Sequence, residues 1–353
     1  MTAFADVPEQ AEAKRLLEAS LADGQAHAFL FHGPRGVGKR RAARAFAGVL
    51  LGDPRRVDGG THPDLRVIEA LGEMIRIDEI RALHHDLHMR PFEADRRVYL
   101  LLDAHLLNDE AAAALLKDLE EPPEYATLVL VADELGPLPE TIRSRCQLIP
   151  FRRLSRAAVE GWVVEQAPDL PVDEARVLAR VAAGRLDRAA RLLDPDARAH
   201  RRELLRVARE AYRAPEFDAV AAAVIFAAST RARGEAARAA ELELVDRLDL
   251  PAREAEQRVK RVEFGAEREE LLASLEDLAA WYRDLVVVAA GADAPVVHAD
   301  RLAELHEDAP GREAGAEEAA AAVRQAWREA EEFNLNASLL LEALFVRVHR
   351  AFA

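Results

Sequence analysis

Hydrophobic residues in the first 150 positions form short runs that alternate with amphipathic stretches. The apolar runs predict five β-strands, at 27–33, 64–70, 96–104, 126–133 and 147–151. The segments between them have helical spacing, at 9–23, 38–52, 75–89 and 108–123. Strands that alternate with helices in this way predict a parallel α/β sheet with helices on both faces.

The pattern changes after residue 151, where strand-like runs end. Residues 153–195 have the spacing of short helices, and residues 200–353 are helical almost throughout. We therefore expect an α/β domain at 1–152, a small helical domain at 153–200 and a larger helical domain at 201–353. The expected fold class is α/β plus all-α.

Composition and charge narrow the class of protein. Half of the 353 residues are hydrophobic, which is enough for a sizeable core. The net charge is −15, so the chain alone is poorly suited to bind nucleic acid, whose phosphates need clustered Lys and Arg. One cysteine excludes a multi-cysteine zinc site and favours a reducing cytoplasm. Neither a signal peptide nor a membrane-spanning run is evident, so no membrane partner is expected.

A glycine-rich segment between the first strand and the next helix fits the phosphate-binding loop motif G-x-x-x-x-G-K. Its candidate nucleotide-binding residues are Gly33, Gly36, Val37, Gly38, Lys39 and Arg40. Backbone N–H groups and the lysine hold phosphates in such loops. Arg40 stands where a hydroxyl residue normally binds Mg²⁺, and a guanidinium cannot do so. The motif therefore predicts a degenerate site for ATP or ADP and leaves Mg²⁺ binding open.

The acidic motif of such a site is also incomplete. ATPases of this kind carry two adjacent carboxylates after a central strand, one for Mg²⁺ and one for the attacking water. This chain has Asp103 there, preceded by Leu102. Since hydrolysis needs the metal to neutralise developing charge, we expect little or none.

Several stretches together resemble bacterial clamp-loader subunits of DNA polymerase III, members of the AAA+ superfamily, and in particular the delta-prime type. They are "HAFLFHGPRGVGKRRAARAFAGVLL", "HPDL", "IDEIRAL", "ALLKDLEEPP" and "TIRSRCQLIPF", with "WYRDL" and "FNLNASLLLEALF" in the C-terminal part. The resemblance implies a RecA-like P-loop domain, a helical lid and a helical collar that joins a ring of subunits. It implies that apolar collar residues such as Leu335, Leu339, Leu340 and Leu344 support assembly.

The resemblance also implies a role without catalysis in this chain's own site. Delta-prime subunits act as stators and lend an arginine to the ATP site of a neighbouring motor subunit, and Ser144 and Arg145 match the motif that carries this arginine finger. The implied partners are the delta and gamma/tau subunits, with the sliding clamp and primed DNA reached through the complex. Arg188 matches a lid position and is a candidate nucleotide sensor.

The histidines at 84, 85 and 88 are the remaining candidates for metal chemistry. His84 and His88 have the i, i+4 spacing of a zinc pair, but no third ligand is evident nearby in the sequence. Delta-prime subunits often carry a four-cysteine zinc module, and this chain lacks it. We therefore expect no zinc and no metal site, and a structural role for the helix that carries these histidines.

Two other functions remain open. Lys39 favours an ATP-hydrolysing motor subunit of the gamma or tau type, whereas Leu102 and Arg40 oppose it. A third reading is a nucleotide-binding protein that acts alone, outside any ring.

Overall fold

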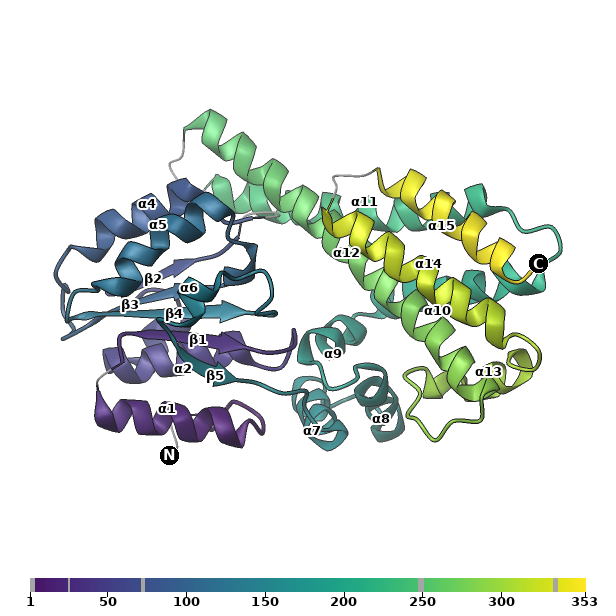
Figure 1. Ribbon diagram of the computed structural model, residues 1–353, viewed down its shortest axis with the longest axis horizontal. Coiled ribbons are helices and arrows are strands. Elements are labelled where there is room, and N and C mark those ends of the chain that lie inside the picture. The colour runs from purple at the N-terminus through teal and green to yellow at the C-terminus, as the bar shows by residue number, and fades with distance from the viewer. Residues whose placement is uncertain (1–3, 25, 71–73, 247–250, 333–335) are drawn as a thin grey trace. The chain divides into compact units, whose positions relative to one another are not determined.

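The computed structural model describes residues 4–353 except 25, 71–73, 247–250 and 333–335 (Figure 1). The chain divides into two compact units. Unit 1 comprises residues 1–162 and 183–188, and unit 2 comprises residues 163–182 and 189–353. The division into three domains remains a prediction, and each unit is described below by itself.

Unit 1 is built on a five-stranded parallel sheet with the order β2-β3-β4-β1-β5 (Figure 1). The strands are β1 (Ala28–His32), β2 (Leu65–Ile68), β3 (Arg97–Leu101), β4 (Ala126–Ala132) and β5 (Gln147–Pro150). Each lies within one of the five predicted apolar runs. The expected fold class is therefore confirmed, because the sheet is parallel and the rest of the chain is helical.

Alternate residues of each strand face opposite sides of the sheet, as the two-residue repeat of a strand requires. On one side, Phe29 and Phe31 of β1 pack in a core that includes Phe46. On the other side, Leu30 joins a second core that includes Leu83 and other residues of the helices on that face. The central strands β3 and β4 are buried along their whole length, which explains why they are almost entirely apolar.

The helices of unit 1 begin and end close to the predicted positions. They are α1 (Ala11–Asp23), α2 (Lys39–Leu51), α3 (Pro54–Asp58), α4 (Ile77–Leu87), α5 (Asp109–Glu120) and α6 (Glu140–Arg143), with a short 3-10 turn, η1 (Ala104–Leu106). Asn108 caps α5, since its side chain accepts a hydrogen bond from the Ala111 N–H. The short helices α3 and α6 were not predicted, because one turn gives no periodic signal.

Unit 2 consists of helices, most of them packed around one large core, with a smaller separate cluster made by Leu178, Val181 and Leu192. Its helices are α8 (Val172–Val181), α10 (Pro195–Arg213), α11 (Ala219–Val245), α12 (Ala252–Ala289), α13 (Leu302–Asp308), α14 (Glu313–Glu332) and α15 (Ala337–Ala351), with a 3-10 turn, η2 (Ala299–Arg301). The helices α7 (Arg156–Gln166) and α9 (Leu186–Leu193) contain positions where the chain passes between the units. None of the helices in the described ranges is long and apolar enough to span a membrane.

The motif residues of the C-terminal part serve mainly as core. Trp281, Tyr282 and Leu285 of "WYRDL" are fully buried in the centre of unit 2. Leu340 and Leu344 are also buried in this core, whereas Leu339 is 66% exposed. Leu335 lies outside the described residues. Part of the predicted apolar collar face is therefore used inside the chain, and Leu339 is left at the surface.

Candidate functional site

The glycine-rich loop joins β1 to α2 with the backbone that a phosphate loop requires. Gly33 and Gly36 have positive φ angles of 138° and 72°. A Cβ atom at Gly33 would lie 2.1 Å from the Phe151 carbonyl oxygen, and one at Gly36 would lie 1.7 Å from an oxygen of Asp187. Both glycines are thus required by close packing as well as by conformation. Val37 is fully buried beneath the loop, and Gly38 precedes the first turn of α2.

Lys39 is turned into the protein and has three partners there. Its Nζ donates to the carbonyl oxygens of Gly33 and Pro34, each at 2.6 Å, and lies 2.8 Å from Asp133 Oδ1. The side chain is 3% exposed. An ammonium group has three N–H donors, so these contacts use its full capacity. Burial lowers the pKa of Lys39, and the charge of Asp133 partly opposes this effect.

Arg40 forms an ion pair with the remaining residue of the acidic motif. Its Nη2 lies 2.5 Å from Asp103 Oδ2, and its Nη1 pairs with Glu69. Asp103 has a positive φ of 58°, a conformation that is uncommon for residues other than glycine. Arg40, at which the loop departs from an active ATPase, is therefore joined to the carboxylate that the acidic motif retains, and its guanidinium lies between two carboxylates.

A fourth carboxylate, that of Asp187, lies against the other end of the loop. Asp187 pairs with Arg35 at 3.3 Å and with Arg185 at 2.7 Å, and the neighbouring Leu186 N–H donates to the Gly36 carbonyl at 2.6 Å. Burial tends to raise the pKa of Asp187, but hydrogen bonds and charge from Arg185 outweigh it and lower the pKa. Asp187 is therefore ionised at neutral pH. The predicted sensor Arg188 follows directly and is 9% exposed.

Gln10, which the sequence analysis missed, holds the loop from the N-terminal side. Its amide nitrogen donates to the carbonyl oxygens of Val37 and Arg152, and its amide oxygen accepts from the Arg152 N–H. The side chain is buried, and all three contacts span long distances in the sequence. Such contacts leave no local pattern, which is why Gln10, Glu69, Asp133 and Asp187 could not be found by motif alone.

These residues do not fit a magnesium-dependent nucleotide site. Asp103, His105 and Asp133 lie close enough to share an ion, but Arg40 pairs with Asp103 and Lys39 pairs with Asp133. Position 40 offers no hydroxyl, and its cation stands beside the carboxylate that the motif retains. No catalytic step through Mg²⁺ follows from this arrangement.

The predicted arginine finger lies on a separate part of unit 1. Arg145 follows α6, with its Nη1 donating to the Thr141 carbonyl at 2.9 Å and its Nη2 lying 2.5 Å from Glu120 Oε1. The side chain is 35% exposed. Ser144 donates to the same Thr141 carbonyl at 3.2 Å. Within the described ranges, no contact joins Arg145 to the glycine-rich loop.

Cys146, next to the candidate finger, is a core residue. It is 9% exposed and packs in the core on the α4–α5 side of the sheet. Burial raises the pKa of its thiol to about 12, so the reactive thiolate is scarce at neutral pH. Cys146 therefore serves as a packing residue of this core.

The fold and loop together define unit 1 as a parallel α/β domain with a glycine-rich phosphate-loop motif, in which Arg40 pairs with Asp103. Residues 9–155 match the family model described as DNA polymerase III, delta subunit. This part of the chain is therefore similar to the DNA polymerase III subunits of clamp loaders, in agreement with the resemblance inferred from the sequence.

The relatives include subunits named delta′ and subunits named tau. DNA polymerase III subunit delta′ of Bacillus subtilis is 33% identical over 171 residues, which are 45% of this chain and 51% of the relative. Subunit tau of the same organism is 34% identical over 209 residues, which are 54% of this chain and 37% of the relative. This chain thus spans about half or less of these relatives.

One solved structure extends over nearly the whole chain. It is a gamma subunit-related protein of DNA polymerase III from Thermotoga maritima, and the match covers 97% of this chain and 100% of that one. The two are 17% identical with a TM-score of 0.42, a similarity too low to support an argument.

Proposed function

We propose that this chain is the delta-prime stator of a bacterial clamp loader. In this role it assembles with delta and gamma/tau subunits in the cytoplasm, and through the complex it helps to place the sliding clamp on primed DNA. It binds nucleotide weakly, hydrolyses none, and contributes Arg145 to the ATP site of a neighbouring motor subunit.

The single observation that carries the proposal is the ion pair between Arg40 and Asp103. In an active site of this class, Mg²⁺ neutralises charge near this carboxylate and contacts a hydroxyl at position 40. In this chain the guanidinium of Arg40 stands at the position of the hydroxyl, and its positive charge lies beside Asp103, where Mg²⁺ would otherwise neutralise the carboxylate. Lys39 is also occupied by carbonyl groups and Asp133, so an incoming phosphate would have to displace existing contacts.

The position of Arg145 supports the second half of the proposal. An arginine that acts on a neighbour's γ-phosphate must be reachable from outside its own subunit. Arg145 is partly exposed, and the Thr141 carbonyl accepts a hydrogen bond from its Nη1 and orients the guanidinium. Holding the group in place before assembly lowers the entropy cost of its use across an interface.

The test is the DNA-stimulated ATPase of a reconstituted clamp loader that contains this chain. We expect Arg145→Ala to leave assembly intact and to lower ATP turnover in part, because only the adjacent motor site loses its arginine. Arg152→Ala is the matched control, since its side chain is 80% exposed and lies on the same unit. Equal turnover by the Arg145→Ala and parent complexes would refute the finger.

The alternative is a motor subunit of the gamma or tau type, which the retained Lys39 and the similarity to tau favour. The purified chain alone decides between the two. A motor hydrolyses ATP in a magnesium-dependent manner, whereas the proposed stator shows no turnover above buffer. A protein that acts alone, the third reading, would remain monomeric when mixed with clamp-loader subunits.

A further inference from the structure

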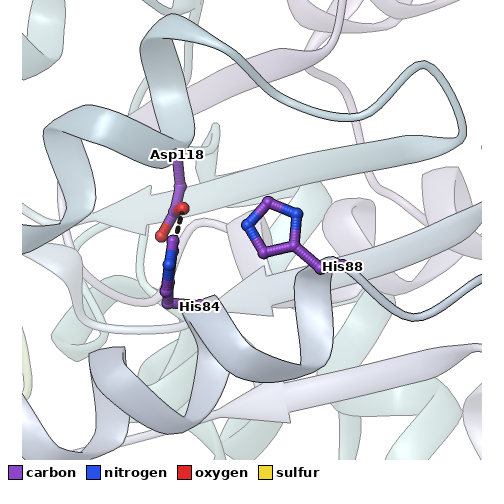
Figure 2. A group of neighbouring side chains, drawn as sticks. All are labelled: His84, His88 and Asp118. Atoms are coloured by element: carbon purple, nitrogen blue, oxygen red, sulfur yellow. Dashed lines mark hydrogen bonds and ion pairs between the residues drawn. The ribbon is translucent and has the colours of Figure 1, made fainter.

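Two histidines and one aspartate meet on the surface of unit 1, away from the glycine-rich loop. His84 lies on α4 and His88 directly follows it, so one helical turn separates them. Asp118 comes from α5, the helix packed beside α4. Figure 2 shows the side chains of His84 and Asp118 pointing toward one another, with the ring of His88 beside them.

The distances are those of a loosely assembled ligand set. Each residue offers one ligand atom, and these atoms all lie within 4.8 Å of one another. His84 Nδ1 and Asp118 Oδ1 are hydrogen-bonded at 2.6 Å, and the two imidazole rings are 4.9 Å apart between centroids. A tetrahedral zinc ion with bonds of 2.0–2.1 Å needs ligand atoms about 3.3 Å apart. His88 is exposed and is free to move inward by a side-chain rotation.

Asp118 gives an independent reason to expect a ligand. Its side chain is 2% exposed, and its Oδ2 atom has no hydrogen-bond partner among the described residues. A buried carboxylate oxygen without a partner carries an uncompensated desolvation cost. A divalent cation between the helices would offset that cost, because it supplies positive charge directly to the carboxylate.

The donor set selects the class of metal. Neutral imidazole nitrogens suit zinc and its neighbours in the transition series, whereas magnesium and calcium prefer sites made of oxygen alone. Two histidines and one carboxylate form a three-ligand set that zinc uses with water in the fourth position.

We propose that His84, His88 and Asp118 form a binding site for a divalent transition-metal ion, with zinc as the physiological choice. The site joins α4 to α5 on one face of unit 1. It opposes our expectation from the sequence that the chain holds no zinc, because Asp118 is the third ligand that the sequence did not reveal. The site needs neither the glycine-rich loop nor Arg145, so it stands apart from the proposed function.

The test adds zinc to the metal-free chain. Isothermal titration calorimetry measures the affinity and the number of ions bound, and thermal unfolding measures the melting temperature with and without zinc. We expect one zinc ion bound through this site and a higher melting temperature when zinc is present. His88→Ala, which alters an exposed residue, should weaken zinc binding by about tenfold or more. Asp118→Asn should do the same, provided that the variant has the circular dichroism spectrum of the parent.

His85→Ala is the matched control, because His85 is exposed on the same helix and lies outside the ligand set. It should leave zinc affinity unchanged. Cobalt(II) gives a second readout, since tetrahedral coordination produces strong visible absorption that His88→Ala should abolish. The proposal is overturned if zinc does not bind, if His88→Ala binds as tightly as the parent, or if His85→Ala weakens binding equally.

Discussion

Arg145 and Glu120 form an ion pair that holds the candidate finger against its own subunit, with 2.5 Å between Nη2 and Oε1. Both side chains are partly exposed, at 35% and 50%. Glu120 is the last residue of α5 and belongs to the "LEEPP" stretch. In the proposed assembly, this carboxylate competes with the γ-phosphate of the neighbour for the same guanidinium.

The first prediction concerns that competition. Glu120→Gln should preserve or raise the DNA-stimulated ATPase of a reconstituted complex, because the arginine is released for the neighbouring site. An exposed ion pair stabilises the folded arrangement by up to about 1 kcal/mol, so the increase in the ATPase rate should not exceed roughly fivefold. A loss as large as that of Arg145→Ala would instead assign the pair a structural role.

The second prediction concerns the guanidinium beside Asp103. Arg40→Thr restores a hydroxyl to the loop and frees Asp103 and Glu69, so Mg-ADP should bind at least about tenfold more tightly. Hydrolysis should still be absent, since Leu102 remains in place of the metal-binding carboxylate. Titration with a fluorescent nucleotide measures the affinity. Arg41→Thr, at the exposed neighbouring position, should bind nucleotide like the parent.

The third prediction concerns Asp64 of the "HPDL" stretch. Its buried carboxylate accepts hydrogen bonds from the backbone N–H groups of Phe92, Glu93 and Ala94, with N···O distances of 2.6, 2.9 and 2.9 Å. Asp64→Ala leaves these donors without a partner and should lower the free energy of unfolding of unit 1 by about 3 kcal/mol. Chemical denaturation followed by circular dichroism measures the change. The exposed Asp58 provides a control, and Asp58→Ala should have little effect.

The fourth prediction concerns a buried acid in unit 2. Asp308 is 1% exposed and receives hydrogen bonds from Arg209, Tyr212 and Arg213. Burial tends to raise its pKa, but these hydrogen bonds, led by that from Arg209, outweigh it and hold the pKa below the ordinary value near 3.8. Asp308→Asn should cost about 3 kcal/mol at pH 7, because the arginines lose a charged partner.

The pH dependence follows from the direction of that shift. A carboxyl group with a lowered pKa in the folded state stabilises the fold fully above its unfolded value, and this stability is lost as pH falls through the folded value. Urea denaturation between pH 7 and pH 3 should therefore show a decline in the parent that is smaller in Asp308→Asn. Identical pH profiles would show that Asp308 does not contribute to acid sensitivity.

The sequence predicted those features of the fold that local pattern encodes. Apolar runs located the five strands of the described sheet, and helical spacing located α1, α2, α4 and α5. The glycine-rich loop was found because its conformation depends on residues adjacent in the chain. The sequence also showed that position 40 of the glycine-rich loop and position 102 of the acidic motif differ from an active ATPase. From these two differences we inferred the loss of ATP hydrolysis.

The interactions that complete the sites could not be predicted in the same way. Glu69 and Asp187 approach the loop from distant segments, and Asp118 reaches His84 from a position 34 residues away. Carboxylates are frequent in this acidic chain, so none of the three stands out by type. These three carboxylates reach their partners only through the tertiary fold. For Asp118, the packing of α4 beside α5 brings the carboxylate to His84.

The placement of Arg40 has a consequence for regulation. A magnesium ion can be chelated, exchanged or released together with a nucleotide, whereas a guanidinium is part of the polypeptide and keeps its charge at every physiological pH. In the proposed role, the positive charge beside Asp103 is therefore present whether or not magnesium or a nucleotide is available, and a chelator cannot remove it.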